Sequence, residues 1–77
     1  MITGEQLREA RLLAGLARIE LAKRASMNVN TFYRYERFGD EFIRCDNTTL
    51  RRVLAVLDAS GVVLLNGAFQ MKREEAD

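Results

Sequence analysis

One short stretch near the middle of the chain carries the side chains best suited to hydrogen-bonding another molecule. If residues 29–37 are helical, one face of the helix presents a set of residues at helical spacing: Val29, Asn30, Tyr33, Arg34 and Arg37. Asn can form two hydrogen bonds with the edge of an adenine, and Arg can form two with a guanine. Val can contact a thymine methyl group, and Tyr a base or a phosphate. Faces of this kind also occur where a helix meets only water, so the pattern leaves both interpretations open.

The elements around this face must hold it in place. Its opposite side carries Phe32, Tyr35 and Glu36, which predicts that this side packs on a core. A shorter helix is predicted for residues 18–25, and the corner Ala25-Ser26-Met27-Asn28 joins the two, with Asn28 as the expected N-cap. Two short helices joined by a tight corner are typical of a helix-turn-helix motif.

Two further helices are predicted on either side of this pair. Thr3 and Gln6 have the spacing of a capping box, and Gly15 is a suitable stop, which predicts a helix over 4–14. The last helix begins at residues 46–48 and ends near residue 59. Its apolar stripe recurs at helical spacing and comprises Leu50, Val53, Leu54 and Leu57. Residues 38–47 are predicted to form a loop, although Phe38, Phe42 and Ile43 are more apolar than a free loop requires and favour folding back on the core or a subunit contact.

After the last helix, Val62–Leu65 is an apolar run between turn-forming residues, which predicts a short strand. Because no partner strand is evident in the chain, we expect residues 62–65 to pair with the same segment of a second subunit. The predicted domain covers residues 1–67, and residues 68–77 are predicted to be a polar, frayed tail.

Composition argues against several classes of protein. The chain has 77 residues, no His and the single cysteine Cys45, so we expect one domain, no disulfide, no structural zinc site and no cofactor. Without His and without a phosphate-binding loop, no set of residues favours an enzyme. No apolar run is long enough for a membrane helix and no secretory signal is apparent, so the expected location is the cytoplasm.

Charge is distributed unevenly along the chain. The net charge is +1, but residues 1–37 contain seven Lys or Arg against four Asp or Glu, a net of +3. Residues 38–53 balance at three against three, and residues 54–77 contain two against four, a net of −2. This asymmetry favours a polyanionic partner for the first half of the chain.

An ordered set of positions over residues 5–60 resembles the phage repressor, Cro and Xre-like family. The matching residues are Gly15-Leu16, Leu21-Ala22, Ala25, Thr31-Phe32, Tyr35-Glu36 and Gly39. The resemblance implies an all-α, repressor-like domain of four or five helices, with the short C-terminal strand as a possible addition. It also implies binding to double-stranded DNA as a homodimer on a two-fold operator, with the helix over 29–37 in the major groove.

The resemblance assigns roles to individual residues. Arg18 stands where the family commonly has a Gln that contacts phosphate or an outer base, and Arg37 and Arg44 stand where backbone contacts occur. The complete set expected to contact DNA is Arg18, Asn28, Val29, Asn30, Tyr33, Arg34, Arg37 and Arg44. Arg11 and Glu36 are charges on apolar faces, and the family has a buried ion pair at these positions, so we expect them to be structural.

Two residues and one spacing depart from the family pattern. Ala17 replaces a Ser or Thr N-cap, Ser26 replaces a Gly at the corner, and Glu36 and Gly39 stand one residue further apart than usual. The preferred hypothesis is a sequence-specific transcriptional regulator that is not an enzyme. An antitoxin of a toxin–antitoxin pair, or a protein-interaction module built on a helix-turn-helix scaffold, remains an alternative.

Overall fold

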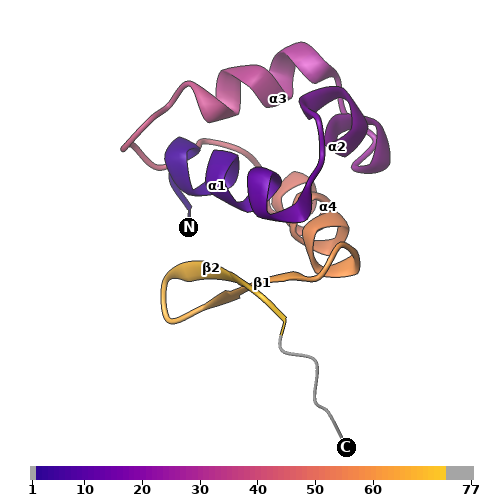
Figure 1. Ribbon diagram of the computed structural model, residues 1–77. Helices are drawn as coiled ribbons and strands as arrows, with labels where there is room; N and C mark the ends of the chain where they lie inside the picture. The colour runs from indigo at the N-terminus through magenta and orange to yellow at the C-terminus, as the bar shows by residue number, and fades with distance from the viewer. Residues whose placement is uncertain (1, 73–77) are drawn as a thin grey trace, which may run out of the picture.

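A computed structural model describes residues 2–72 and contains four helices followed by two strands (Figure 1). The elements are α1 (Gly4–Ala14), α2 (Arg18–Arg24), α3 (Val29–Glu36), α4 (Asn47–Ala59), β1 (Val62–Leu65) and β2 (Ala68–Met71). The four helices fall within about one residue of the predicted positions. Within residues 2–72, none of these helices has the length and apolar character that crossing a bilayer requires.

The C-terminal hairpin shows that the prediction of an all-α fold is wrong. β1 pairs with β2 in antiparallel register from Val62↔Met71 to Leu65↔Ala68, so its partner lies in the same chain. Asn66 and Gly67 connect the strands with φ of 52° and 77°. Positive φ at both central residues is what a two-residue type I′ turn requires, and Asn-Gly is the sequence that favours it.

The same hairpin also corrects the predicted domain boundary. Ala68–Met71 form β2 and are therefore not a frayed tail. Of the rest of that predicted tail, Lys72 follows β2 and residues 73–77 lie outside the described residues. Because the strand at 62–65 is paired within the chain, it no longer gives a reason to expect pairing with the same segment of a second subunit.

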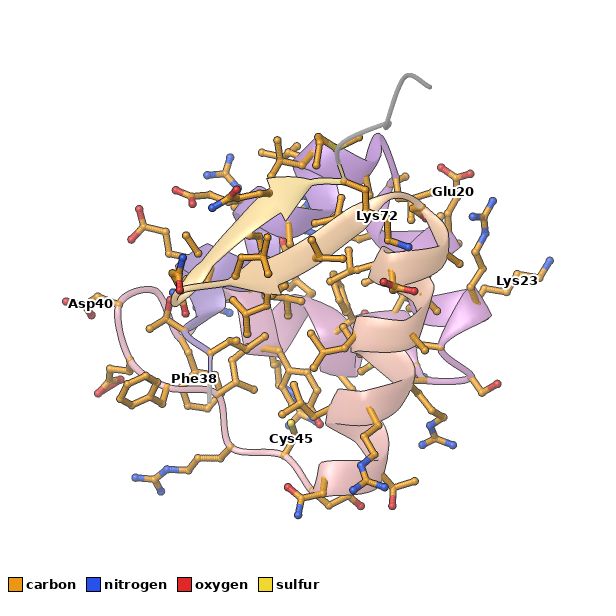
Figure 2. The ribbon with its side chains drawn as sticks, turned by 90° about the horizontal axis from the view of Figure 1, so that it is seen from below. Glu20, Lys23, Phe38, Asp40, Cys45 and Lys72 are labelled. Carbon is orange, nitrogen blue, oxygen red and sulfur yellow. The ribbon has the colours of Figure 1, made fainter. Side chains whose placement is uncertain are left out.

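The elements are arranged so that α1 lies between α3 and the hairpin (Figure 1). The core between them contains Leu7 of α1, Phe32 of α3, Leu57 of α4 and Val62 of β1, each at most 1% exposed. Seen from below, the hairpin lies in front of the helices and spreads across that side of the molecule (Figure 2). The hairpin and the outer face of α3 are therefore on opposite sides.

Two predicted caps of α1 are present in the structure. The Gln6 backbone N–H donates to the Thr3 hydroxyl at 3.1 Å, and the Thr3 N–H donates to Gln6 Oε1 at 2.9 Å, completing the capping box. Gly15 follows the helix with φ 71°. These contacts set where α1 begins and ends.

A sharp turn that ends α2 fixes the path from α2 to α3. The Met27 N–H donates to the Ala22 carbonyl and the Ser26 N–H to the Lys23 carbonyl, which is the Schellman pattern. Ser26 adopts φ 57°, the left-handed conformation that Gly adopts at lower cost. At the other end of α2, Ala17 has no side-chain acceptor, and its own N–H donates to Glu20 Oε1 at 3.0 Å.

The start of α1 is pressed against the end of α3. A Cβ atom on Gly4 would lie 2.5 Å from the Tyr35 carbonyl oxygen and 2.7 Å from that of Glu36. The Glu5 N–H donates to the Gly39 carbonyl at 2.8 Å, which holds the turn that follows α3. Because only glycine has no Cβ, α1 can approach α3 this closely only at this residue.

The segment between α3 and α4 folds back as its apolar residues suggested. The Ile43 N–H donates to the Ile2 carbonyl at 2.9 Å, and the Ile43 side chain is buried. Phe38 packs against the core, whereas Phe42 remains 56% exposed. The segment is thus tied to the N-terminus and leaves one aromatic ring at the surface.

Candidate nucleic-acid interface

The outer face of α3 is a row of exposed polar and basic side chains. Asn30, Tyr33, Arg34 and Arg37 are all exposed, while Phe32 and Glu36 point inward and are buried. Residues four apart on a helix share a face, so Asn30 and Arg34 lie one turn apart, as do Tyr33 and Arg37. We refer to Asn30, Tyr33, Arg34 and Arg37 as the α3 face.

Two residues predicted to contact DNA have other contacts. Val29 is partly buried and packs against the core, so its placement among the outward residues was only partly right. The Asn28 side-chain oxygen accepts a hydrogen bond from the Asn30 N–H at 2.7 Å, as an N-cap does. Asn28 thus begins α3 and fixes the position of Asn30.

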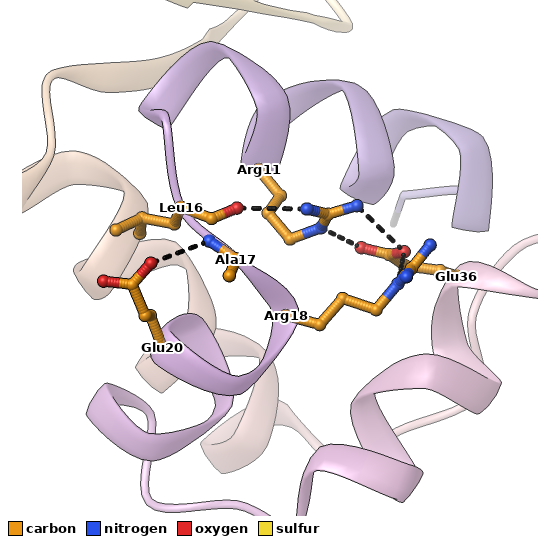
Figure 3. Close-up of polar contacts among 6 residues, drawn as sticks. All are labelled: Arg11, Leu16, Ala17, Arg18, Glu20 and Glu36. Atoms are coloured by element: carbon orange, nitrogen blue, oxygen red, sulfur yellow. Dashed lines mark hydrogen bonds and ion pairs between the residues drawn. The ribbon is translucent and has the colours of Figure 1, made fainter.

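Beneath the α3 face, Glu36 binds Arg11 in a buried ion pair (Figure 3). Arg11 Nε lies 2.6 Å from Glu36 Oε2 and Nη2 lies 3.5 Å from Oε1, while Arg11 Nη1 donates to the Leu16 carbonyl at 3.0 Å. The two side chains are only 9% and 3% exposed. This pair joins α1 to α3, which is the structural role that the sequence suggested.

Arg18 joins the same carboxylate from the first residue of α2. Its Nε lies 2.7 Å from Glu36 Oε1, and its side chain is 40% exposed (Figure 3). One carboxylate therefore faces two guanidinium groups, which leaves a net charge of +1 on the cluster. Sequence analysis missed this contact because residues 18 and 36 lie on separate helices and nothing in their spacing brings them together.

Arg18 also reaches the α3 face itself. Its Cζ atom lies over the Tyr33 ring, 5.0 Å from the ring centroid, and Arg37 Cζ lies 5.8 Å from the same centroid. Both distances are within the range of a cation–π interaction. Arg18, Tyr33 and Arg37 thus form one continuous basic and aromatic surface across α2 and α3.

Arg44 lies apart from this surface. It is exposed in the segment between α3 and α4, in a shallow hollow that Phe38, Asp40, Glu41 and Phe42 also line. Asp40 and Glu41 weaken the attraction of this hollow for a polyanion, and Glu41 also lines a neighbouring hollow with Arg34 and Arg37, at the end of the α3 face. Among the described residues, contacts join Arg18, Tyr33 and Arg37, and Arg34 lines one hollow with Arg37. Arg44 lines a different hollow.

Three residues with shifted pKa values lie near one another: Tyr35 of α3, and Cys45 and Asp46, which directly precede α4. Burial raises the pKa of the Cys45 thiol, and the nearby Asp46 carboxylate raises it further, so the thiol stays protonated at neutral pH. Burial likewise raises the pKa of Tyr35. Hydrogen bonds from the Thr49 side chain and backbone lower the pKa of Asp46, the N-cap of α4. A protonated thiol is a weak nucleophile and a poor metal ligand.

Comparisons with known proteins identify no relative of this chain. No protein-family model, no functionally curated protein and no solved structure matches it.

Proposed function

We propose that the protein binds double-stranded DNA through the α3 face and acts as a sequence-specific transcriptional regulator. The observation that carries the proposal is the α3 face itself, which is exposed and bears no acidic side chain. It belongs to the second of two helices joined by a tight turn, and such a helix fits the major groove of B-DNA. The resemblance of residues 5–60 to phage repressors supports the same assignment.

Within the α3 face, the proposed roles follow from side-chain chemistry. Asn30 and Arg34 have the donors and acceptors needed to recognise adenine and guanine by paired hydrogen bonds. Tyr33 can contact a base or a phosphate, and Arg37 supplies a charge for the backbone. This role also agrees with the cytoplasmic location that the sequence suggests.

A regulator of this kind commonly acts as a symmetric dimer, and the hairpin offers a surface for one. The Lys72 N–H donates to the Gly61 carbonyl, so these two residues form a hydrogen-bonded pair of the antiparallel ladder. Such pairs alternate with pairs whose N–H groups point outward, so the N–H groups of Phe69 and Met71 point away from β1. We therefore propose that two copies pair along the free edge of β2.

The orientation of the hairpin suits this dimer. Antiparallel pairing of the two β2 edges continues one sheet, and the two-fold axis then stands perpendicular to that sheet. Since the sheet and α3 are on opposite sides of α1, both α3 helices face the same side of the dimer (Figure 1). Packing the outer faces of the two hairpins against each other would instead turn the α3 helices in opposite directions.

The dimer is tested by removing one outward N–H at a time. Met71→Pro removes a donor from the free edge of β2 and is expected to shift the protein toward monomer in sedimentation equilibrium. Leu64→Pro removes the equivalent donor from the β1 edge and is expected to leave the dimer intact. A loss of dimer with Leu64→Pro alone would assign the interface to β1, and a wild-type protein that stays monomeric on DNA would exclude the dimer.

The function is tested by selecting bound DNA from a random duplex pool with the untagged protein at moderate salt. We expect an enriched two-fold motif, and we expect Asn30→Ala and Arg34→Ala each to relax the preference at particular bases. Arg8→Ala, which removes an exposed charge from α1, serves as the matched control and is expected to keep the motif. No enrichment with the wild-type protein would contradict the proposal.

One feature favours a protein-interaction module or antitoxin as the second candidate function. The outer side of the hairpin carries Val63, Leu65, Ala68 and Gln70, which are uncharged, and Leu65 is 50% exposed. Such a face suits contact with another protein. Binding to a protein partner that persists at high salt, together with no affinity for duplex DNA, would favour this candidate, because DNA affinity falls steeply with salt.

A further inference from the structure

We infer that Arg18 is a positioning residue that holds the Tyr33 ring in place for reading a base pair, and that Glu36 in turn holds Arg18. This inference rests on the proposed DNA-binding function of the α3 face. It assigns Arg18 a role other than the contact with phosphate or an outer base that the family resemblance implies. The role is carried by a chain of contacts from the core to the surface.

This series of contacts begins at Glu36, a buried residue. Glu36 is 7% exposed, and Arg11 holds its carboxylate from α1 through the contacts at 2.6 and 3.5 Å. Its Oε1 atom then accepts a hydrogen bond from Arg18 Nε at 2.7 Å. Because Nε is one of the three nitrogens of the planar guanidinium group, this bond constrains the direction of the whole group and not merely the position of its charge.

The guanidinium group of Arg18 then meets the Tyr33 ring. Its Cζ atom lies 5.0 Å from the ring centroid, while Arg37 Cζ lies 5.8 Å from it. An isolated Tyr side chain on an exposed helix face samples several rotamers, and it loses this conformational freedom when it is fixed on binding. Contact with two guanidinium groups favours one ring position in the free protein, which reduces the entropy lost when DNA binds.

A phosphate contact and a positioning role have different consequences. A phosphate contact depends on charge, acts equally on all sequences and contributes about 0.9 to the slope of log affinity against log salt. A positioning residue acts through Tyr33, so its effect disappears when Tyr33 is absent and is confined to the base pair that Tyr33 contacts. Lys at position 18 keeps the charge but has neither Nε–H nor a planar group to stack.

The experiment is a double-mutant cycle on the affinity for the selected duplex, measured by fluorescence anisotropy over a series of salt concentrations. We expect Arg18→Gln to weaken binding about fivefold in the wild-type background and less than about twofold in the Tyr33→Ala background. We also expect Arg18→Lys to behave like Arg18→Gln. The salt slope is expected to stay within about 0.3 of the wild-type value.

Two further readouts complete the test. Repeating the DNA selection with Arg18→Gln is expected to relax the preference at the same base pair as Tyr33→Ala does. A thermal melt of each variant separates a binding effect from loss of folding, and Arg8→Gln is the matched control for loss of one exposed charge. Arg11 has its own contacts with Glu36, at 2.6 and 3.5 Å, so we expect the buried pair to remain when Arg18 is replaced.

The opposite results would overturn the inference. Additive effects of Arg18→Gln and Tyr33→Ala, full affinity with Arg18→Lys, or a salt slope lower by about 0.9 would identify Arg18 as a phosphate contact. These outcomes would leave the proposed function standing, because the wild-type protein still binds DNA. A wild-type protein that binds no DNA would overturn both.

Discussion

At the scale of single residues, Glu36 connects the core to the proposed interface. It lies on α3 yet points inward, and it binds one guanidinium group below the surface and another at its edge. The pair with Arg11 was predictable, because two charges on otherwise apolar helix faces require each other, and the family resemblance placed them together. The contact with Arg18 was not predictable, because it depends on how the start of α2 docks beside the end of α3.

Replacing Glu36 with Ala is expected to lower the free energy of unfolding by roughly 3–5 kcal/mol, since it leaves the buried Arg11 side chain without its counter-charge. Chemical denaturation followed by circular dichroism measures the change. Glu9→Ala removes an exposed carboxylate from α1 and is the matched control, with an expected change near zero. An unchanged Tm for Glu36→Ala would exclude a stabilising role for the pair.

Ser26 provides a prediction of the opposite sign. Its φ of 57° is disfavoured for a residue with a Cβ, so Ser26→Gly is expected to raise the free energy of unfolding by about 1 kcal/mol. Asn66 adopts a similar φ of 52°, but Asn tolerates this conformation better, so Asn66→Gly is expected to produce a smaller gain. Equal gains at both positions, or a loss at Ser26, would show that φ does not limit stability here.

At the scale of elements, the helices were predictable from the sequence, whereas only the first strand of the hairpin was predicted. Caps and stops such as Thr3, Gly15 and Asn28 act within a few residues, so they are visible in the sequence. Asn66-Gly67 is also a local signal, and an Asn-Gly pair between apolar segments predicts a hairpin. It was interpreted as the end of a lone strand because Ala68–Met71 is less apolar than β1 and looks like part of a polar tail.

The close approach of α1 to α3 leaves no signal in the sequence, because a Gly at the start of a helix has many uses. In the structure, a Cβ at Gly4 would lie within 3 Å of backbone atoms of Tyr35, Glu36 and Gly39. Gly4→Ala is therefore expected to destabilise the protein by roughly 1–3 kcal/mol in chemical denaturation, although Ala is the better helix former. Glu5→Ala is the control on the same helical turn, and a stabilising effect of Gly4→Ala would contradict the packing described.

The N-cap of α4 predicts a dependence of stability on pH. Because hydrogen bonds from Thr49 lower the pKa of Asp46, the ionised carboxylate stabilises the folded state above the ordinary pKa of Asp, and this stability is lost as pH falls through the lowered value. Asp46→Asn keeps a capping oxygen but cannot ionise. The Tm difference between wild type and Asp46→Asn is therefore expected to be larger near pH 6 than near pH 2, and a difference independent of pH would contradict this account.

At the scale of the whole molecule, α1 separates two surfaces of different chemistry. The α3 face is polar and basic, and the hairpin, which lies on the other side of α1 (Figure 1), is largely apolar. This arrangement could not be derived from the sequence, since it depends on long-range packing among residues such as Leu7, Phe32 and Val62. The outward residues of α3 could be derived, because helical periodicity alone identifies them.

The central claim is that the α3 face is the surface that meets DNA, and amide chemical-shift mapping tests it most directly. The ¹⁵N-labelled protein is titrated at low salt with a short duplex, and the shift of each backbone amide is followed. We expect the largest shift changes in residues 28–37 and at Arg18. In β2 we expect no change on addition of DNA other than one that dimer formation itself causes. Changes confined to the hairpin, with α3 unaffected, would contradict the account.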